Sequence, residues 1–151
     1  MTEADLKGGL MHVGRAYLGP SYMLIRHEDQ TRSGVPDISL TGAGWSSWWE
    51  GKMIRGNSMV STGVQDLTML RLARAGFARY LLWEDSGDYK RVYIAEPREV
   101  VALDGTHVTL WRSSAKTAYA SSWSAVHKLT LQYMHEIHAL GPRPIRRTDD
   151  L

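Results

Sequence analysis

The sequence contains no cysteine, a single phenylalanine and no long hydrophobic run. Without cysteine the chain can form neither a disulfide nor a thiolate metal site, and this composition fits a reducing compartment. No stretch approaches the ~18 apolar residues of a membrane-spanning helix. The first seven residues carry acid early and have no apolar core, unlike a secretory signal. These absences predict a cytoplasmic protein with no membrane partner.

An excess of one charge is also lacking, because the formal net charge is only +2. An electrostatic attraction to nucleic acid would have to come from local clusters of basic side chains. Such clusters exist, at Arg71, Arg74 and Arg79 and again at Arg143, Arg146 and Arg147. A solvated helix face and a polar tail explain them more simply, so charge alone is weak evidence about partners.

The length of 151 residues and the order of predicted elements indicate one domain of the α/β class with a mixed sheet. Thr2 can cap a first helix that Gly19-Pro20 ends, and Gly76 ends a second helix. A loop or weak helix start is expected over 113–124. The predicted helices are 3–18, from Ser61 or Thr62 to Ala75, and 122–140; the predicted strands are 21–27, 35–41, 46–54, 77–84, 89–95 and, after a hairpin at Asp104-Gly105, 107–111.

Two acidic residues are expected to face each other across a hairpin. The stretch 41–44, Thr-Gly-Ala-Gly, has the small residues of a tight turn. A turn centred between its last two residues places Asp37 directly opposite Glu50 if the hairpin is regular. Opposed side chains have Cβ atoms about 4.5–5.5 Å apart. Lys52 lies two residues past Glu50, so strand alternation puts it on the same face. A β-bulge would change this register.

Asp37, Glu50 and Lys52 form a coherent set for hydrolysing a phosphodiester. Carboxylates suit Mg²⁺ or Mn²⁺, and two neighbouring carboxylates ionise together most readily with a cation between them. A lysine beside the cation can stabilise an attacking hydroxide or the charge that develops on the phosphate. The simpler alternative is a solvated hairpin face with a cross-strand Lys–Glu pair, but both acids lie within hydrophobic strands. The segment 135–138, His-Glu-Ile-His, lacks the spacing of a helical zinc pair and is expected on a helix surface.

The stretch Ser33-Gly34-Val35-Pro36-Asp37, followed by Trp49-Glu50-Gly51-Lys52, resembles the PD-(D/E)XK nuclease superfamily. Pro-Asp, twelve residues and then Glu-x-Lys match its signature. The chain is similar to the VRR-NUC and phage or archaeal Holliday-junction-resolvase-like branch in its G-x-PD start and in a glutamine one helix later. The resemblance covers about residues 3–84 and implies a restriction-endonuclease-like core, a mixed central sheet flanked by helices. We expect a single nuclease domain, 1–151, with a core over about 3–95, a C-terminal hairpin and helix over about 96–140 and a tail over 141–151.

The resemblance implies a role for each matching position. Asp37 and Glu50 would be metal ligands for Mg²⁺, for which Mn²⁺ would substitute. The backbone carbonyl of Gly51 would be a third ligand. Lys52 would position or activate the attacking water.

Further residues are expected around this centre. Gln65 would lie beside the site and orient the substrate or Lys52. Members often carry an acid on the first helix, and Glu3 is the best candidate, although a first-turn glutamate is also favoured by the helix dipole. Glu28 is a rival in a polar loop. Contacts to the nucleic acid are expected from Arg32, Ser33 and Arg55.

The resemblance therefore implies a Mg²⁺-dependent DNA endonuclease, with branched DNA or a Holliday junction as its substrate. Cutting a junction needs two active sites, which implies a homodimer. If the protein is phage-encoded, its place is the host cytoplasm. Three alternatives stay open: an exonuclease or restriction-like nuclease, a catalytically silent nucleic-acid-binding module of the same fold, and a small interaction protein of unrelated fold in which the motif is accidental.

Overall fold

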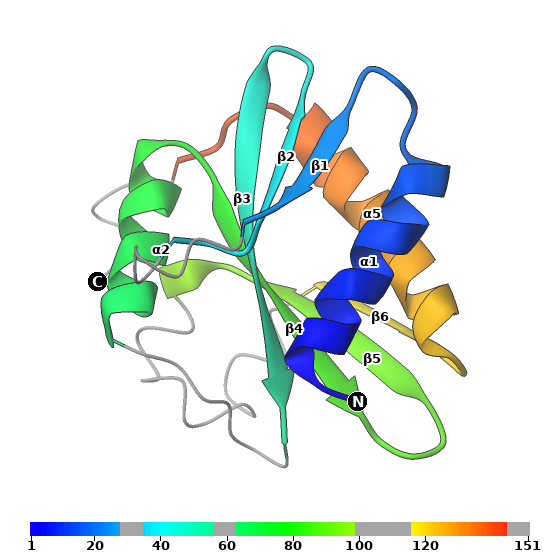
Figure 1. Ribbon diagram of the computed structural model, residues 1–151. Helices are drawn as coiled ribbons and strands as arrows, with labels where there is room; N and C mark the ends of the chain where they lie inside the picture. The colour runs from blue at the N-terminus through cyan, green and yellow to red at the C-terminus, as the bar shows by residue number, and fades with distance from the viewer. Residues whose placement is uncertain (28–34, 56–62, 99–115, 145–151) are drawn as a thin grey trace.

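Six strands form one mixed sheet, in chain order, in the computed structural model, which describes residues 1–27, 35–55, 63–98 and 116–144 (Figure 1). β3 and β4 are parallel, and all other neighbours are antiparallel. The predicted α/β class with a mixed sheet is confirmed. The strands are β1 (Met23–Arg26), β2 (Ile38–Gly42), β3 (Trp45–Ile54), β4 (Ala78–Asp85), β5 (Lys90–Ala95) and β6 (Lys116–Ala120).

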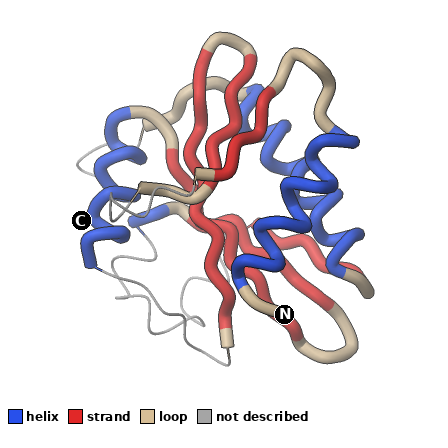
Figure 2. The backbone as a smooth tube through the Cα atoms, viewed as in Figure 1, coloured by secondary structure: helices blue, strands red, loops and turns tan. Residues whose placement is uncertain are grey.

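In the described part of the chain, the helices α1 (Glu3–Tyr17), α2 (Gly63–Ala75) and α5 (Trp123–Ala139) cover the two faces of the sheet. α1 and α5 lie side by side on one face, and α2 lies on the other (Figures 1 and 2). α1 begins with a capping box, because the Thr2 side chain accepts from the Asp5 amide and the Asp5 side chain accepts from the Thr2 amide. None of the helices in the described ranges is long and apolar enough to cross a membrane.

The sheet separates two apolar cores because side chains alternate along each strand. Trp49, Leu81 and Trp83 are fully buried and pack with residues of α1 and α5. Tyr80 and Leu82 point the other way and pack with residues of α2. Burying one large apolar side chain stabilises the fold by roughly 1.5–3 kcal/mol, so both cores hold β3 and β4 firmly at the centre.

The hairpin between β2 and β3 has the predicted register. Ala43 and Gly44 both have positive φ, 54° and 86°, as a two-residue type I′ turn requires. The paired residues run from Gly42 opposite Trp45 to Ile38 opposite Trp49. The next position along this register brings Asp37 beside Glu50.

The strand predicted over 35–41 begins later, at Ile38. Pro36 has no amide hydrogen to donate to a ladder. The amide of Asp37 donates to the side chain of Glu50 rather than to the backbone of β3. Asp37 therefore lies just before the strand, where its side chain is free to turn toward β3.

The segment 113–124, predicted as a loop or weak helix start, contains the edge strand β6 over Lys116–Ala120. The small side chain of Ala118 is buried in the core below α5, whereas Tyr119 is 65% exposed. Period-two burial of an alanine is a weak signal in sequence, because alanine is also a good helix former. The hairpin predicted at Asp104-Gly105 and the strand over 107–111 lie outside the described residues.

His138 was expected on a helix surface but is fully buried. Its Nε2 donates to the carbonyl of Gly42 at 2.7 Å, which leaves Nδ1 to accept from Ser47 Oγ at 2.8 Å. Trp49 in turn donates from Nε1 to Ser47 Oγ at 2.9 Å. This chain of hydrogen bonds ties α5 to the hairpin that carries Glu50.

Candidate active site

β3 extends past its partner strand and exposes a free edge. Pairing with β2 ends at Trp49, whereas β3 continues to Ile54, and no strand in the described part of the chain pairs with this edge beyond Trp49. Unpaired strand amides need other acceptors. The amide of Gly51 donates to Oδ2 of Asp37 at 3.3 Å, and the amide of Met53 donates to Oε1 of Glu3 at 3.0 Å. The carboxylates of Asp37 and Glu3 thus accept the hydrogen bonds that a neighbouring strand would otherwise accept.

Asp37 and Glu50 lie against each other at the start of this edge. The amide of Asp37 donates to Oε2 of Glu50 at 3.0 Å. The side chain of Glu50 is 1% exposed, and that of Asp37 is 21% exposed. The pair is therefore fully buried on the Glu50 side and only partly exposed on the Asp37 side.

Lys52 and Gln65 complete the surroundings of Glu50. Gln65, in the first turns of α2, donates from Nε2 to Oε1 of Glu50 at 2.6 Å. Lys52 Nζ lies 3.9 Å from the same oxygen, and its side chain is 11% exposed. The structure thus brings together four residues that the sequence analysis grouped: Asp37, Glu50, Lys52 and Gln65.

Lys7 of α1 also belongs to this cluster and was missed. Its Nζ lies 2.6 Å from Oδ2 of Asp37, with the lysine side chain 12% exposed. A signal existed in the sequence, because Lys7 follows Glu3 by four residues and such residues share one helix face. Once Glu3 is placed at the site, Lys7 is expected there too.

Burial and neighbouring charges together change the pKa of Glu50. Burial, followed by the neighbouring charge of Asp37 and a hydrogen bond with it, raises the pKa of Glu50 to about 9. The charges of Lys52 and Lys7 act in the opposite direction but are smaller effects. At neutral pH Glu50 therefore keeps a proton unless a further cation lies beside the pair.

Tyr80 anchors the helix that carries Gln65. It is fully buried, lies opposite Glu50 in the parallel β3–β4 register, and donates its hydroxyl to Oδ1 of Asp66 at 2.6 Å. Burial and this hydrogen bond raise the pKa of Tyr80, so the hydroxyl stays protonated as a donor. The bond holds the residue next to Gln65 against the sheet.

Gly51 has no room for a side chain. A Cβ at this position would lie 2.6 Å from the ring of Trp83 and 3.2 Å from Cε of Lys7. Glycine therefore lets the Trp83 ring and the Lys7 stem pack directly against β3. The N–H and C=O of one strand residue point to the same side, so the carbonyl of Gly51 faces the free edge, as its amide does.

The donor set fits a hard divalent cation. It consists of the carboxylates of Asp37 and Glu50 with the carbonyl of Gly51, all oxygen ligands of the kind Mg²⁺ and Mn²⁺ prefer. The ammonium of Lys7 already lies 2.6 Å from Oδ2 of Asp37, so one cationic group is present beside these donors. Across the residues that the structure describes, there is no group of three or more histidine, aspartate or glutamate side chains that could hold a metal ion. A metal here would rely on the carbonyl and on water.

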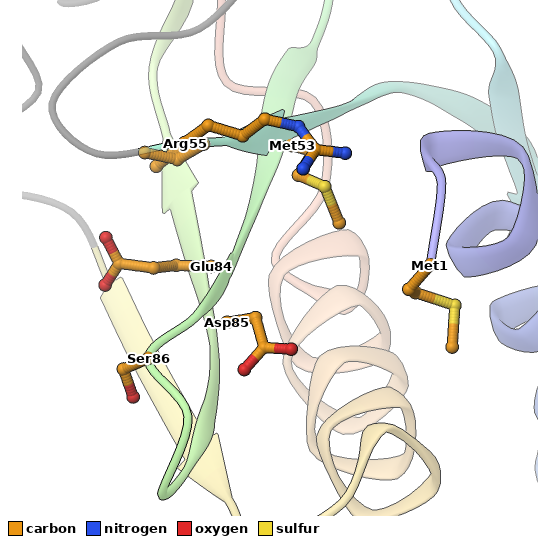
Figure 3. A pocket seen from close by; sticks show the side chains of 7 residues that line it. Met1, Met53, Arg55, Glu84, Asp85 and Ser86 are labelled. Atoms are coloured by element: carbon orange, nitrogen blue, oxygen red, sulfur yellow. The ribbon is translucent and has the colours of Figure 1, made fainter.

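A pocket lies beside this cluster rather than over it. It has a volume of about 560 Å³ at the ends of β3 and β4 (Figure 3). Arg55 and Asp85 extend toward the space that Met1 borders on the other side (Figure 3). Arg55 therefore lies past the end of the free edge, away from Asp37. The other expected contact residues, Arg32 and Ser33, and the rival acid Glu28 lie outside the described residues.

Comparison of the chain with protein-family models, with curated proteins and with solved structures finds no match. Its function is therefore inferred from its own residues and their geometry.

Proposed function

We propose that the chain is a Mg²⁺-dependent nuclease that hydrolyses phosphodiester bonds in DNA, built on a restriction-endonuclease-like core of the PD-(D/E)XK type. The observation that carries this proposal is the position of Asp37 and Glu50, which lie in contact at the free edge of β3 with Lys52 on the same strand. A structural ion pair alone would not need a second carboxylate with a strongly raised pKa. Perturbed acids of this kind are typical of functional sites.

Each residue has a role in the proposed reaction. A bound Mg²⁺ would neutralise charge on the phosphate and make a water molecule bound to it more acidic. Asp37, Glu50 and the carbonyl of Gly51 would hold it. Lys52 places its ammonium on the same side of β3 as Glu50, where it stabilises negative charge that develops on the attacking or departing oxygen.

Gln65 acts through Glu50 and is a positioning residue. Its amide fixes one carboxylate oxygen, and the amide of Asp37 fixes the other. A ligand that is already oriented loses less entropy when it binds its cation. Glu3 holds the free edge of β3 in place, because it accepts a hydrogen bond from the Met53 amide, one residue beyond Lys52.

The kind of DNA that we propose as substrate is inferred from the sequence motif rather than from the geometry of the site. The order of Gly-x-Pro-Asp, Glu-x-Lys and a helical glutamine supports the VRR-NUC and resolvase-like branch, and with it a branched substrate. Cutting both arms of a junction requires two centres, so we propose a homodimer that acts in the cytoplasm. An exonuclease or restriction-like nuclease would use the same residues.

A panel of substrates tests this proposal. Purified protein is incubated with linear, flapped and four-way DNA and with matching RNA, in Mg²⁺ or EDTA. Internal cuts in branched DNA support the structure-specific endonuclease, and products released only from ends indicate an exonuclease. Binding of DNA with no cleavage of any form would overturn the enzyme in favour of a non-catalytic module.

A further inference from the structure

Lys7 is held at the candidate active site by more than a surface ion pair. Its Nζ lies 2.6 Å from Oδ2 of Asp37, and its side chain is only 12% exposed. The stem packs so close to β3 that its Cε would lie 3.2 Å from a Cβ at Gly51. Exposed ion pairs contribute little because water and salt screen them. This pair is largely shielded from both.

The contact occupies one of the two oxygens of the carboxylate that would bind a metal ion. Oδ2 of Asp37 already accepts the amide of Gly51 at 3.3 Å and the ammonium of Lys7 at 2.6 Å. A divalent cation bound to the same carboxylate would lie within a few ångströms of the ammonium. Two cations at such a separation repel each other strongly where water is largely excluded.

Resting on the function proposed above, we propose that Lys7 is the resident counter-ion of Asp37 and that a divalent metal binds only by displacing it. Lysine suits this role, because its ammonium sits on a flexible four-carbon stem and can leave without moving α1. Lys7 therefore lowers the affinity of the site for its metal. It also keeps the Asp37 carboxylate paired when no metal is bound.

Metal binding to the whole chain tests this directly. Mn²⁺ alone is titrated by calorimetry into metal-free wild type, Lys7→Met, Lys7→Arg and Lys128→Met. Lys128 is exposed on α5, so its removal controls for the loss of one positive charge anywhere on the surface. Methionine is a good helix former of similar length, and Lys7→Gln serves as a second variant if Lys7→Met does not fold.

We expect Lys7→Met to bind Mn²⁺ about tenfold to a hundredfold more tightly than wild type, within the usual range of coupling free energies in proteins. Lys7→Arg keeps a cation at Asp37 and should bind close to the wild-type affinity, as should Lys128→Met. Adding Asp37→Asn to Lys7→Met should abolish the gain, because the carboxylate is then gone.

Two results would overturn the inference in distinguishable ways. If wild type binds Mn²⁺ and Lys7→Met binds it equally or more weakly, Lys7 is a structural residue and the nuclease proposal is untouched. If neither protein binds Mn²⁺ at millimolar concentration, the metal site fails, and with it both the inference and the proposed function. Tight binding that survives Asp37→Asn would place the metal elsewhere and would also overturn the inference.

Discussion

The backbone amide of Asp37 donates a 3.0 Å hydrogen bond to Oε2 of Glu50, so the two acids of the candidate site meet through a bond that the hairpin register enforces. Asp37 returns the contact by accepting the amide of Gly51, the residue after Glu50. Any shift of one residue between β2 and β3 would send one of these side chains to the opposite face. The turn at Ala43-Gly44 therefore determines whether Asp37 and Glu50 meet at the site.

This dependence predicts that the turn can be improved. Ala43 has a φ of 54°, and the left-handed region costs an L residue roughly 1–2 kcal/mol. Ala43→Asn creates Asn-Gly, the preferred pair for a type I′ turn, and should raise the free energy of unfolding by about 0.5–1 kcal/mol. Ala43→Val, which is β-branched, should lower it. Urea denaturation followed by circular dichroism measures both; equal stability of all three proteins would contradict the turn assignment.

Glu50 should be a source of instability in metal-free protein. Its pKa is raised from 4.5 to about 9, so the folded state binds one more proton than the unfolded state between these values. Stability therefore falls as the pH rises through this window. Glu50→Gln removes the titration and should stabilise the protein by about 1–3 kcal/mol at pH 7.

The measurement is thermal unfolding in EDTA at several pH values from 5 to 9. The advantage of Glu50→Gln over wild type should widen as the pH rises. Glu136→Gln, at an exposed position of α5, should show no such trend. An advantage that stayed constant or narrowed with pH would mean that Glu50 is ionised in the folded protein.

The burial of His127 predicts a second, separate loss of stability, at acid pH. It is 3% exposed between Trp83 and Trp123, and burial lowers its pKa from 6.5 to about 4. The folded state favours the neutral ring, so this contribution is present above pH 6.5 and is lost as the pH falls toward 4. The total loss is about 3 kcal/mol.

His127→Leu should reduce the loss of stability as the pH falls from 6.5 toward 4. The exposed control His12→Leu should leave that loss unchanged. Chemical denaturation at pH 7, 5.5 and 4.5 follows the effect without reference to activity. If His127→Leu loses stability with acid as steeply as wild type, burial does not lower the pKa of the ring.

The hairpin could be predicted from sequence because its register depends on local features: a turn of two small residues and the alternation of strand side chains. Asp37, Glu50 and Lys52 follow from that register. Gln65 came from the resemblance, and the structure places its side chain on Glu50.

Features that depend on packing between distant segments could not be predicted in the same way. Lys7 reaches Asp37 only because α1 packs beside the free edge of β3, and nothing in the local sequence states how far β2 extends. His138 is buried because α5 docks on the hairpin, where the carbonyl of Gly42 and the hydroxyl of Ser47 satisfy its ring nitrogens. β6 is an edge strand in which two of the five residues are alanine, and alanine also favours helices.

The most direct test of the central claim is the rate of DNA cleavage by wild type and Asp37→Asn, measured side by side in Mg²⁺ and in EDTA. Wild type should cut in Mg²⁺ and lose all activity in EDTA. Asp37→Asn, with unchanged circular dichroism, should cut at least about a hundredfold more slowly, because a lost metal ligand removes several kcal/mol of charge stabilisation. Cleavage by wild type that persists in EDTA, or that Asp37→Asn leaves intact, would contradict a metal-dependent centre at Asp37 and Glu50.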